Sequence, residues 1–343
     1  MGRITPTTRL CDIGNASRDF AKLSKWLFLY TKTGGEKTIA DKFGAAQAEL
    51  IAEALNAWED DALSGAPVST NLYSREAIEK DPDKGRTHLF YMAGEPGAPW
   101  AMICPGGAYS TVTLLSEGFP VALELNRLGY NAFILCYRAA QHGLMPRPLD
   151  DLAAAIRRVR ALSDKYNVSK EEYAVLGFSA GGHLAALWGS ESMGWARHKL
   201  PPPQALLLGY PALSTALAYD QLQNGTMDAD GVKINKIYLN MIAGRGYTRE
   251  DALRWSGETH VSDAFPPTYM LQCEDDPLVS PEGSRRMAAE LAARNIPCEL
   301  RMEHEGGHGF GPGAGTAAEN WLEDACSFWD RQAGREHDPW EEQ

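Results

Sequence analysis

The sequence predicts an α/β fold in which helices cover both faces of a mostly parallel sheet. From Thr87 onward, short apolar runs alternate with segments that carry apolar residues at helical spacing, which is typical of such a sheet. One of these runs, Tyr173–Leu176, is followed at once by a glycine-rich turn and an apolar helix pattern. Two segments depart from the alternation, residues 1–80 and 213–262, and are predicted to be additions to the main domain.

Residues 1–80 are predicted to form a helical extension. Apolar residues recur at helical spacing in Phe20–Tyr30 and in Phe43–Trp58, and the turn Thr33–Lys37 joins the two segments. Residues 63–72 are predicted to be a loop or an edge strand. Nothing in the extension resembles a reactive site. It is expected to pack on the main domain or on another subunit, so a homodimer stays open.

Residues 81–332 are predicted to form the main domain, followed by a polar C-terminal tail at 333–343. The predicted strands are His88–Met92, Trp100–Cys104, Asn131–Tyr137, Tyr173–Leu176, Ala205–Leu208, Thr268–Cys273 and Cys298–Met302. The predicted helices are Gly118–Leu128, Pro148–Tyr166, Gly181–Trp188, Pro281–Arg294 and Thr316–Gln332.

The composition limits the classes of partner. A net charge of -12 over 343 residues, without a basic run, argues against nucleic acid and anionic membrane and favours small neutral molecules. The six cysteines and the histidines have no metal-type spacing, so no metal is expected. The N-terminus lacks the apolar core of a signal peptide and no segment is long enough to span a bilayer, which predicts a cytoplasmic protein.

The strongest motif is Gly177-Phe-Ser-Ala-Gly181, which matches the G-x-S-x-G pattern of a nucleophile elbow. There a serine, here Ser179, sits on a strained turn between a strand and a helix. A side chain at position 177 or 181 would collide with the neighbouring strand or helix. The helix start supplies N–H groups and a positive dipole end for a developing oxyanion. Taken alone, the motif is also compatible with an ordinary glycine-rich turn.

Three segments supply the partners that a serine nucleophile needs. After the strand Trp100–Cys104, the loop Cys104–Tyr109 contains adjacent glycines, and the N–H groups of Gly107, Ala108 and Ala180 are predicted to form an oxyanion hole. By itself, this loop would more often be a simple strand-end turn.

Downstream, three acids follow the strand Thr268–Cys273. Asp276 is predicted to orient the base, Asp275 is the alternative, and Glu274 is expected to face solvent. His308, between two glycines, is predicted to be the base. His304 is expected to be a satisfied structural imidazole. His183, one turn beyond Ser179, is able to approach the nucleophile, but a regular helix constrains it poorly as a base.

Residues 213–262 are predicted to form a cap over this site, because about 50 residues exceed an ordinary connection between two strands. The large side chains predicted to line the substrate pocket are Tyr109, from the glycine loop, and Tyr219, Tyr238, Met241 and Trp255, from the insertion. The alternative is a surface insertion whose aromatic residues serve its own small core.

The order Ser179, Asp276, His308 across successive strand ends is the order of α/β-hydrolases. With the loop Cys104–Tyr109 and the segments Gly129–Phe133 and Pro148–Ala153, residues 85–332 resemble α/β-hydrolase esterases of the hormone-sensitive-lipase and acetyl-xylan or feruloyl esterase-like groups. The resemblance departs at Ala108, where a third glycine is common. Ala108 is expected to narrow the pocket and to leave the oxyanion hole intact.

This resemblance implies an α/β-hydrolase fold and a serine carboxylic-ester hydrolase without cofactor, acting on short acyl groups of a carbohydrate or other small-molecule ester. Two alternatives remain. A peptidase like prolyl oligopeptidase shares the fold, although it usually carries a propeller for which this chain is too short. A non-catalytic ligand-binding protein on the same scaffold often loses a residue of the triad.

Overall fold

A computed structural model of the chain describes residues 2–27 and 35–335 and contains one eight-stranded sheet in the order β1-β2-β4-β3-β5-β6-β7-β8. The strands are β1 (Ser69–Thr70), β2 (His88–Met92), β3 (Trp100–Cys104), β4 (Asn131–Cys136), β5 (Tyr173–Phe178), β6 (Ala205–Gly209), β7 (Thr268–Cys273) and β8 (Cys298–Glu303). Neighbours from β4 to β8 pair in parallel, whereas β2 pairs antiparallel with both β1 and β4. The predicted, mostly parallel sheet is confirmed, and Ser69–Thr70 is an edge strand.

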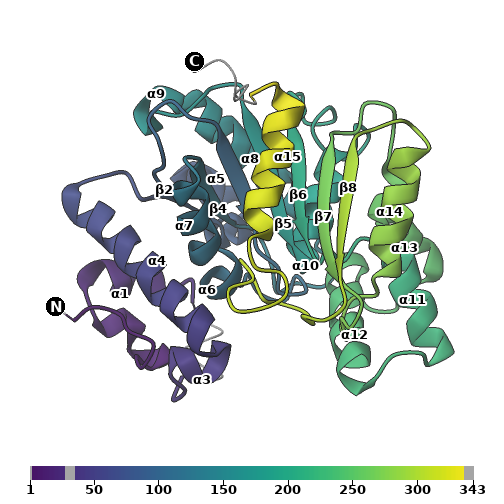
Figure 1. Cartoon of the computed structure of the whole chain (residues 1–343), viewed down its shortest axis with the longest axis horizontal. Coiled ribbons are helices and arrows are strands. Elements are labelled where there is room, and N and C mark those ends of the chain that lie inside the picture. The colour runs from purple at the N-terminus through teal and green to yellow at the C-terminus, as the bar shows by residue number, and fades with distance from the viewer. Residues whose placement is uncertain (1, 28–34, 336–343) are drawn as a thin grey trace, which may run out of the picture.

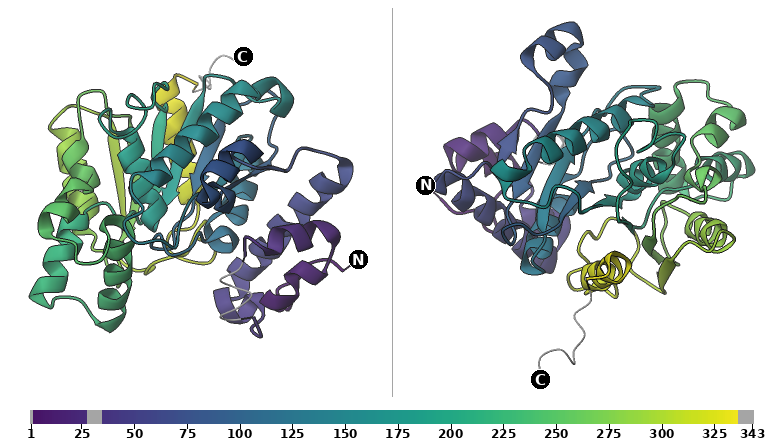
Figure 2. Two further views of the ribbon diagram at one scale, coloured as in Figure 1. Left: turned by 180° about the vertical axis from the view of Figure 1, so that it is seen from behind. Right: turned by 90° about the horizontal axis from the view of Figure 1, so that it is seen from above.

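Helices cover both faces of this sheet, as predicted (Figures 1 and 2). One face carries α7 (Phe119–Arg127) and α15 (Trp321–Ala333), and the opposite face carries α8 (Arg147–Ala161) and α10 (Ser179–Gly189). The shorter connecting helices are α5 (Arg75–Lys80), η2 (Pro82–Arg86), α6 (Leu114–Glu117) and α9 (Ser163–Tyr166), and α14 (Glu282–Ala292) packs beside β8.

Two helix predictions need correction at their boundaries. The predicted helix Thr316–Gln332 begins only at Trp321, because Asn320 adopts a left-handed conformation with φ 65° and interrupts a continuous helix. The predicted helix Pro148–Tyr166 is divided into α8 and α9 at Leu162, whose φ of -119° is not helical.

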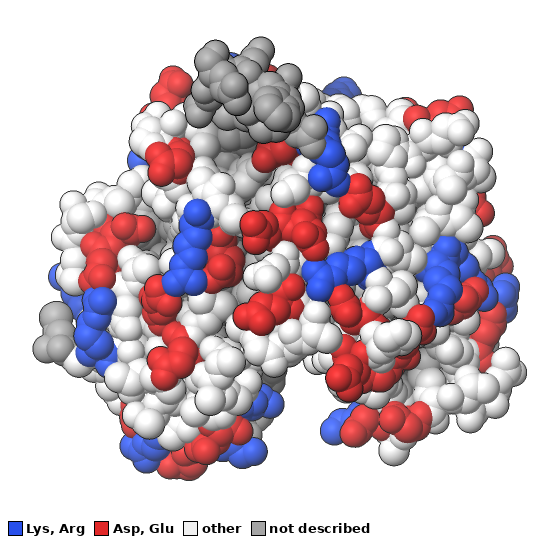
Figure 3. Space-filling model, viewed as in Figure 1, with Lys and Arg blue, Asp and Glu red and all other residues white. Residues whose placement is uncertain are grey.

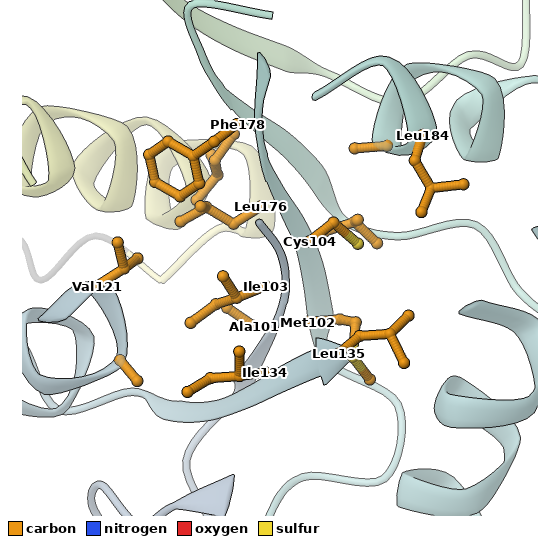
Figure 4. Packing of buried hydrophobic residues seen from close by; sticks show 14 of the residues in the cluster. Ala101, Met102, Ile103, Cys104, Val121, Ile134, Leu135, Leu176, Phe178 and Leu184 are labelled. Carbon is orange, nitrogen blue, oxygen red and sulfur yellow. The ribbon is translucent and has the colours of Figure 1, made fainter. Parts of the chain in front are cut away.

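The centre of the sheet is buried on both faces, which explains its apolar runs without polar alternation. Successive side chains of β3 point to opposite sides (Figure 4). Ile103 lies with Val121 of α7, whereas Cys104 lies toward Leu184 of α10. Burying a side chain of this size contributes about 1.5–3 kcal/mol, so the paired faces fix the sheet between its helices.

The N-terminal extension contains η1 (Leu10–Asn15), α1 (Arg18–Ser24), α3 (Ile39–Phe43) and α4 (Ala45–Ser64). α4 packs along α7, where the Trp58 ring lies 5.8 Å from that of Phe119. One cluster of buried side chains continues from Ile4 to Trp329, so the extension docks on the main domain of its own chain. The domain boundaries and the homodimer stay predictions.

Two sequence predictions fall partly outside the described residues. The predicted helix Phe20–Tyr30 is α1 up to Ser24, and its last residues, together with part of the turn Thr33–Lys37, are not described. Of the predicted tail at 333–343, only the first three residues are described. Within residues 2–27 and 35–335, no helix combines the length and the apolar character needed to cross a membrane.

The insertion at 213–262 forms α11 (Thr215–Asn224), α12 (Ala229–Ala243), α13 (Arg249–Arg254) and η3 (Gly257–His260). In Figure 1 these helices lie beneath β7 and β8, and the N-terminal helices lie on the other side of the same lower edge. Figure 3 shows a notch between the two lobes. This lower edge is where α10 begins and where the candidate site lies.

Candidate active site

Ser179, His308 and Asp276 form a continuous hydrogen-bonded chain at the carboxyl ends of β5, β7 and β8. Nε2 of His308 lies 2.9 Å from Oγ of Ser179, and Nδ1 of His308 lies 2.7 Å from Oδ2 of Asp276. A carboxylate only accepts hydrogen bonds, so Nδ1 carries the proton and Nε2 is left to accept from the serine hydroxyl. This is the geometry that lets an imidazole take a proton from a serine nucleophile.

The turn that presents Ser179 is strained and tightly packed. Ser179 has a φ of 50°, in the left-handed region that side chains rarely adopt. A Cβ added at Gly181 would lie 1.9 Å from the carbonyl oxygen of Cys104, and one at Gly177 would lie 2.4 Å from the carbonyl oxygen of Gly181. These close approaches are the collisions expected from the sequence, so only glycine fits at both positions.

The two neighbouring acids after β7 have different tasks. Asp276 is fully buried and accepts hydrogen bonds from Gln272 Nε2 and from the N–H groups of Leu278 and Val279, in addition to its contact with His308. This network fixes the carboxylate that orients the imidazole.

Asp275, the alternative acid, contacts the loop after β8 that carries His308, called here the histidine loop. It accepts hydrogen bonds from the N–H groups of Gly306 and Gly307. Glu274 is exposed and paired with Arg285. His304 is exposed and makes no hydrogen bond within the described residues, so it is not the satisfied structural imidazole that the sequence suggested.

The loop after β3 lies beside Ser179. Gly107, Ala108 and Tyr109 have φ values of 121°, 52° and 54°, and three consecutive positive values reverse the chain beside the elbow. Across the part of the chain that the structure describes, no hydrogen bond occupies the N–H of Gly107 or Ala108. Ala180 lies in the first turn of α10, where N–H groups have no partner within the helix.

A buried carboxyl group that sequence reasoning missed holds this loop in place. Glu117 accepts from the N–H of Gly106 at 2.6 Å, from the hydroxyl of Thr113 at 2.6 Å and from the hydroxyl of Tyr210 at 2.9 Å. The Tyr210 oxygen in turn accepts from the N–H of Gly311 at 2.8 Å.

The Tyr210 ring also contacts His308, with ring centroids 4.8 Å apart. Burial, and then the Glu117 carboxyl group, raise the pKa of Tyr210 well above its usual value, so its hydroxyl stays protonated as a donor. One buried network therefore connects the loop Cys104–Tyr109 after β3, called here the oxyanion loop, to the histidine loop. A Glu at the end of a short apolar helix gives no motif by which it could be recognised.

His183 is not a base for Ser179, because both of its nitrogens are engaged elsewhere. Nε2 lies 2.5 Å from the carbonyl oxygen of Trp255 and must donate, so Nδ1, 2.9 Å from the Tyr109 hydroxyl, accepts. Burial lowers the pKa of His183 to about 4, which keeps it neutral. His183 therefore fastens the insertion to the oxyanion loop.

The five predicted pocket residues lie away from the cavity beside Ser179. Tyr109 and Tyr238 are buried and stack on each other beneath the loop, and the Tyr238 hydroxyl donates to the carbonyl oxygen of Ala212. Tyr238 borders a separate cavity of about 20 Å³, room for about one water.

Trp255 contacts His183 through its backbone, Tyr219 packs edge-on against Tyr247, and Met241 belongs to the outer part of the same apolar cluster. None of the five borders the cavity beside Ser179, contrary to the prediction, because these residues pack within the insertion or between it and the main domain. The insertion contributes Ile234 to the cavity instead.

The cavity that contains Ser179 and His308 has a volume of about 540 Å³, which suits a small organic ligand. Gly107, Ala108, Glu117 and the histidine loop form its inner side. The residues that border it from the N-terminal extension are Leu10, Lys37, Lys42 and Phe43. The extension, where no site was predicted, therefore supplies part of the pocket, while the cap-like insertion supplies less of it than expected.

No group of three or more His, Cys, Asp or Glu side chains that could hold a metal ion occurs among residues 2–27 and 35–335. What the arrangement can do is covalent acyl transfer: a hydroxyl nucleophile, an oriented imidazole and backbone donors for an oxyanion meet at one cavity.

Comparison with known proteins gives a consistent picture. The acetylxylan esterase of Xylanibacter ruminicola is 28% identical over 236 residues, which cover 67% of this chain and 45% of that protein. The endo-1,4-beta-xylanase B of Butyrivibrio fibrisolvens is 29% identical over 61% of this chain and 32% of its own length. The chain thus spans less than half the length of these relatives.

Among solved structures, an acetyl ester-xyloside bifunctional hydrolase from Caldicellulosiruptor lactoaceticus superimposes with a TM-score of 0.64 at 28% identity, covering 79% of this chain and 98% of that one. The family model described as the alpha/beta hydrolase fold matches residues 106–311, which contain the elbow, the acid and the histidine. This protein belongs to the alpha/beta hydrolase fold family.

Proposed function

We propose that this protein is a serine carboxylic-ester hydrolase that removes acetyl groups from a carbohydrate. The observation that carries the proposal is the hydrogen-bonded chain from Asp276 through His308 to Ser179 at the floor of a 540 Å³ cavity. The contact between Ser179 and His308 has the length at which a proton passes from the hydroxyl to the imidazole, and the contact with Asp276 holds the imidazole in the tautomer that accepts it.

The proposed reaction has two halves. Ser179 attacks the ester carbonyl as Nε2 of His308 takes its proton, and Asp276 stabilises the imidazolium that results. The N–H groups of Gly107, Ala108 and Ala180 receive the oxyanion. His308 then protonates the leaving alcohol. In the second half, water activated by His308 attacks the acyl-Ser179 carbonyl, and the acid leaves.

Two lines support an acetyl group on a carbohydrate. A relative named as an acetylxylan esterase is similar to 67% of this chain, and a solved structure named as an acetyl ester-xyloside bifunctional hydrolase is similar to 79% of it. In addition, Ala108 stands in the oxyanion loop where a Cβ takes up space beside Ser179, which favours a short acyl group.

Hydrolysis of nitrophenyl esters from acetate to decanoate tests the proposal, with Ser179→Ala measured in parallel. We expect the highest kcat/KM for acetate and a fall of about a millionfold in kcat for the variant, as when one member of a triad is removed. A Ser179→Ala protein that keeps near-normal rates would end the assignment. A maximum at long chains would keep the triad and reject the acetyl group.

The peptidase and the binding protein remain as competing functions. The same assay separates them: cleavage of peptide amides with no ester preference favours the peptidase, and no turnover of either substrate class favours a binding protein. The intact triad geometry speaks for turnover.

A further inference from the structure

Two lysines of the N-terminal extension stand at the mouth of the catalytic cavity. Lys37 precedes α3 and Lys42 lies on α3, and both border the cavity that contains Ser179. Both are exposed residues. Within the described residues neither makes an ion pair or hydrogen bond through its side chain, although the protein has a net charge of -12.

The acids nearest in sequence are already engaged. Asp41 accepts hydrogen bonds from the N–H of Thr38 and caps α3, and the charge of Lys37 is the weakest of the contributions that lower the pKa of Asp41. Glu36 pairs with Arg9. Inside the cavity, the one acidic side chain on its lining is Glu117, which three hydrogen-bond donors enclose. Lys37 and Lys42 are therefore the cationic side chains among the described residues that line this cavity.

The position of the lysines decides which part of a substrate they meet. In this arrangement the acyl group is held at Ser179, and the alcohol part of the ester extends toward Lys37 and Lys42 on the lining of the same cavity. Two ammonium groups on the lining of one cavity attract a carboxylate.

Resting on the function proposed above, we infer that Lys37 and Lys42 form an anion-binding subsite that selects acetyl esters whose carbohydrate part carries a carboxylate, that is, a uronic-acid unit. The subsite lies outside the segment that the family shares, since the family match begins at residue 106. It is a property of this chain's own extension.

The test compares acetate release from acetylated neutral xylo-oligosaccharides with release from acetylated xylo-oligosaccharides that carry one uronic acid. We expect the wild-type protein to favour the acidic substrate by about fivefold in kcat/KM, through KM, because surface charges in water act weakly. Replacing both lysines (Lys37→Gln with Lys42→Gln) removes this preference, and replacing both with arginine keeps it. Raising the salt concentration lowers it in the wild-type protein.

The matched control carries Lys165→Gln and Lys170→Gln. This variant has the same change in net charge, but its substitutions lie before β5, at the opposite edge of the sheet from the cavity. The control is expected to keep the preference. Nitrophenyl acetate, which has no carboxylate, should be hydrolysed equally by all these proteins.

The outcomes separate the two proposals. If wild-type protein hydrolyses nitrophenyl acetate but treats the two oligosaccharides alike, or if the double glutamine variant keeps the preference, the subsite is wrong and the esterase stands. Failure to release acetate from either oligosaccharide, with nitrophenyl acetate still hydrolysed, rejects the carbohydrate substrate and the subsite together. No hydrolysis of nitrophenyl acetate rejects the esterase itself.

Discussion

The two walls of the catalytic cavity are built in different ways. The inner wall, formed by Gly107, Ala108, Glu117, Ser179 and His308, consists of turns at strand ends whose backbone is fixed by positive φ values and buried hydrogen bonds. The outer wall, formed by Leu10, Lys37, Lys42, Phe43 and Ile234, consists of side chains from the extension and the insertion, which reach the cavity through long-range packing.

The inner wall carries the groups that react with the substrate, and the outer wall determines which substrate is bound. A reacting group tolerates little displacement, so the inner wall is held by short contacts within the sheet edge. The outer wall touches only the part of a substrate that does not react, and changes there alter binding more than the chemical step. Substitutions in the inner wall should lower kcat for every ester, whereas those in the outer wall should change which ester is preferred.

The largest effect is expected at Asp276. Asp276→Asn removes the charge that stabilises the imidazolium and favours the wrong tautomer of His308, so kcat should fall about ten-thousandfold. Asp275→Asn is the matched control, because Asp275 contacts only the backbone of the histidine loop, and a loss of less than about a hundredfold is expected. Steady-state kinetics with nitrophenyl acetate measure both. Equal losses would contradict the assignment of the acid.

The buried contact that His183 makes between the insertion and the oxyanion loop should make the stability of the protein depend on pH. The pKa of buried His183 is lowered to about 4 in the folded protein, so between pH 6.5 and 4 the unfolded chain binds the extra proton. The stability that the neutral imidazole contributes is present above pH 6.5 and is lost as the pH falls, by up to about 3 kcal/mol.

Urea unfolding at pH 7 and pH 5 measures this loss, and His183→Gln should lose less between the two values. Burial also lowers the pKa of His88, to about 4, so some dependence on pH should remain in the variant. An unchanged slope in His183→Gln would show that His183 is not the titrating group.

Glu117 is expected to have a smaller effect on catalysis. Glu117→Gln keeps the size of the side chain but adds a donor where three donors already converge, which displaces Gly106 and the oxyanion loop. We expect kcat to fall about tenfold, less than the loss of an oxyanion-hole donor itself, with KM little changed. Glu117→Asp should restore part of the rate. A change in KM alone would place Glu117 in substrate binding.

The smallest effect is expected at the outer wall. Ile234→Ala enlarges the mouth of the cavity and should shift the preference among nitrophenyl esters toward longer chains by about threefold. Tyr238→Phe is the control, since Tyr238 lies beneath the loop and does not border this cavity. If Tyr238→Phe changed the preference and Ile234→Ala did not, the roles given to the two residues would be reversed.

The sequence was sufficient for the inner wall apart from Glu117, and it was insufficient for the outer wall. The positions of Ser179, Asp276 and His308 follow from local patterns, because a strand end, a glycine turn and chain order together place side chains at one sheet edge. Tyr238 and Trp255 were assigned to the pocket because they are large and lie in the insertion, but the direction of a helical side chain depends on what the helix packs against.

Lys37 and Phe43 are the opposite case, because they border the cavity although their local sequence does not indicate it. They lie more than a hundred residues before Ser179 in sequence, and only the docking of α4 on α7 brings them to the cavity. Glu117 was missed for a related reason, since Gly106 and Thr113 come from the loop before its helix but Tyr210, after β6, reaches it only in the folded sheet.

The most direct test of the central claim is covalent trapping of the nucleophile. Incubation with diethyl para-nitrophenyl phosphate, followed by peptide mass spectrometry, should find one diethylphosphoryl group on the peptide that contains Ser179, in proportion to the esterase activity lost. Ser179→Ala protein should take up none. Full loss of activity with the label on another residue, or full activity after stoichiometric labelling of Ser179, would contradict the account.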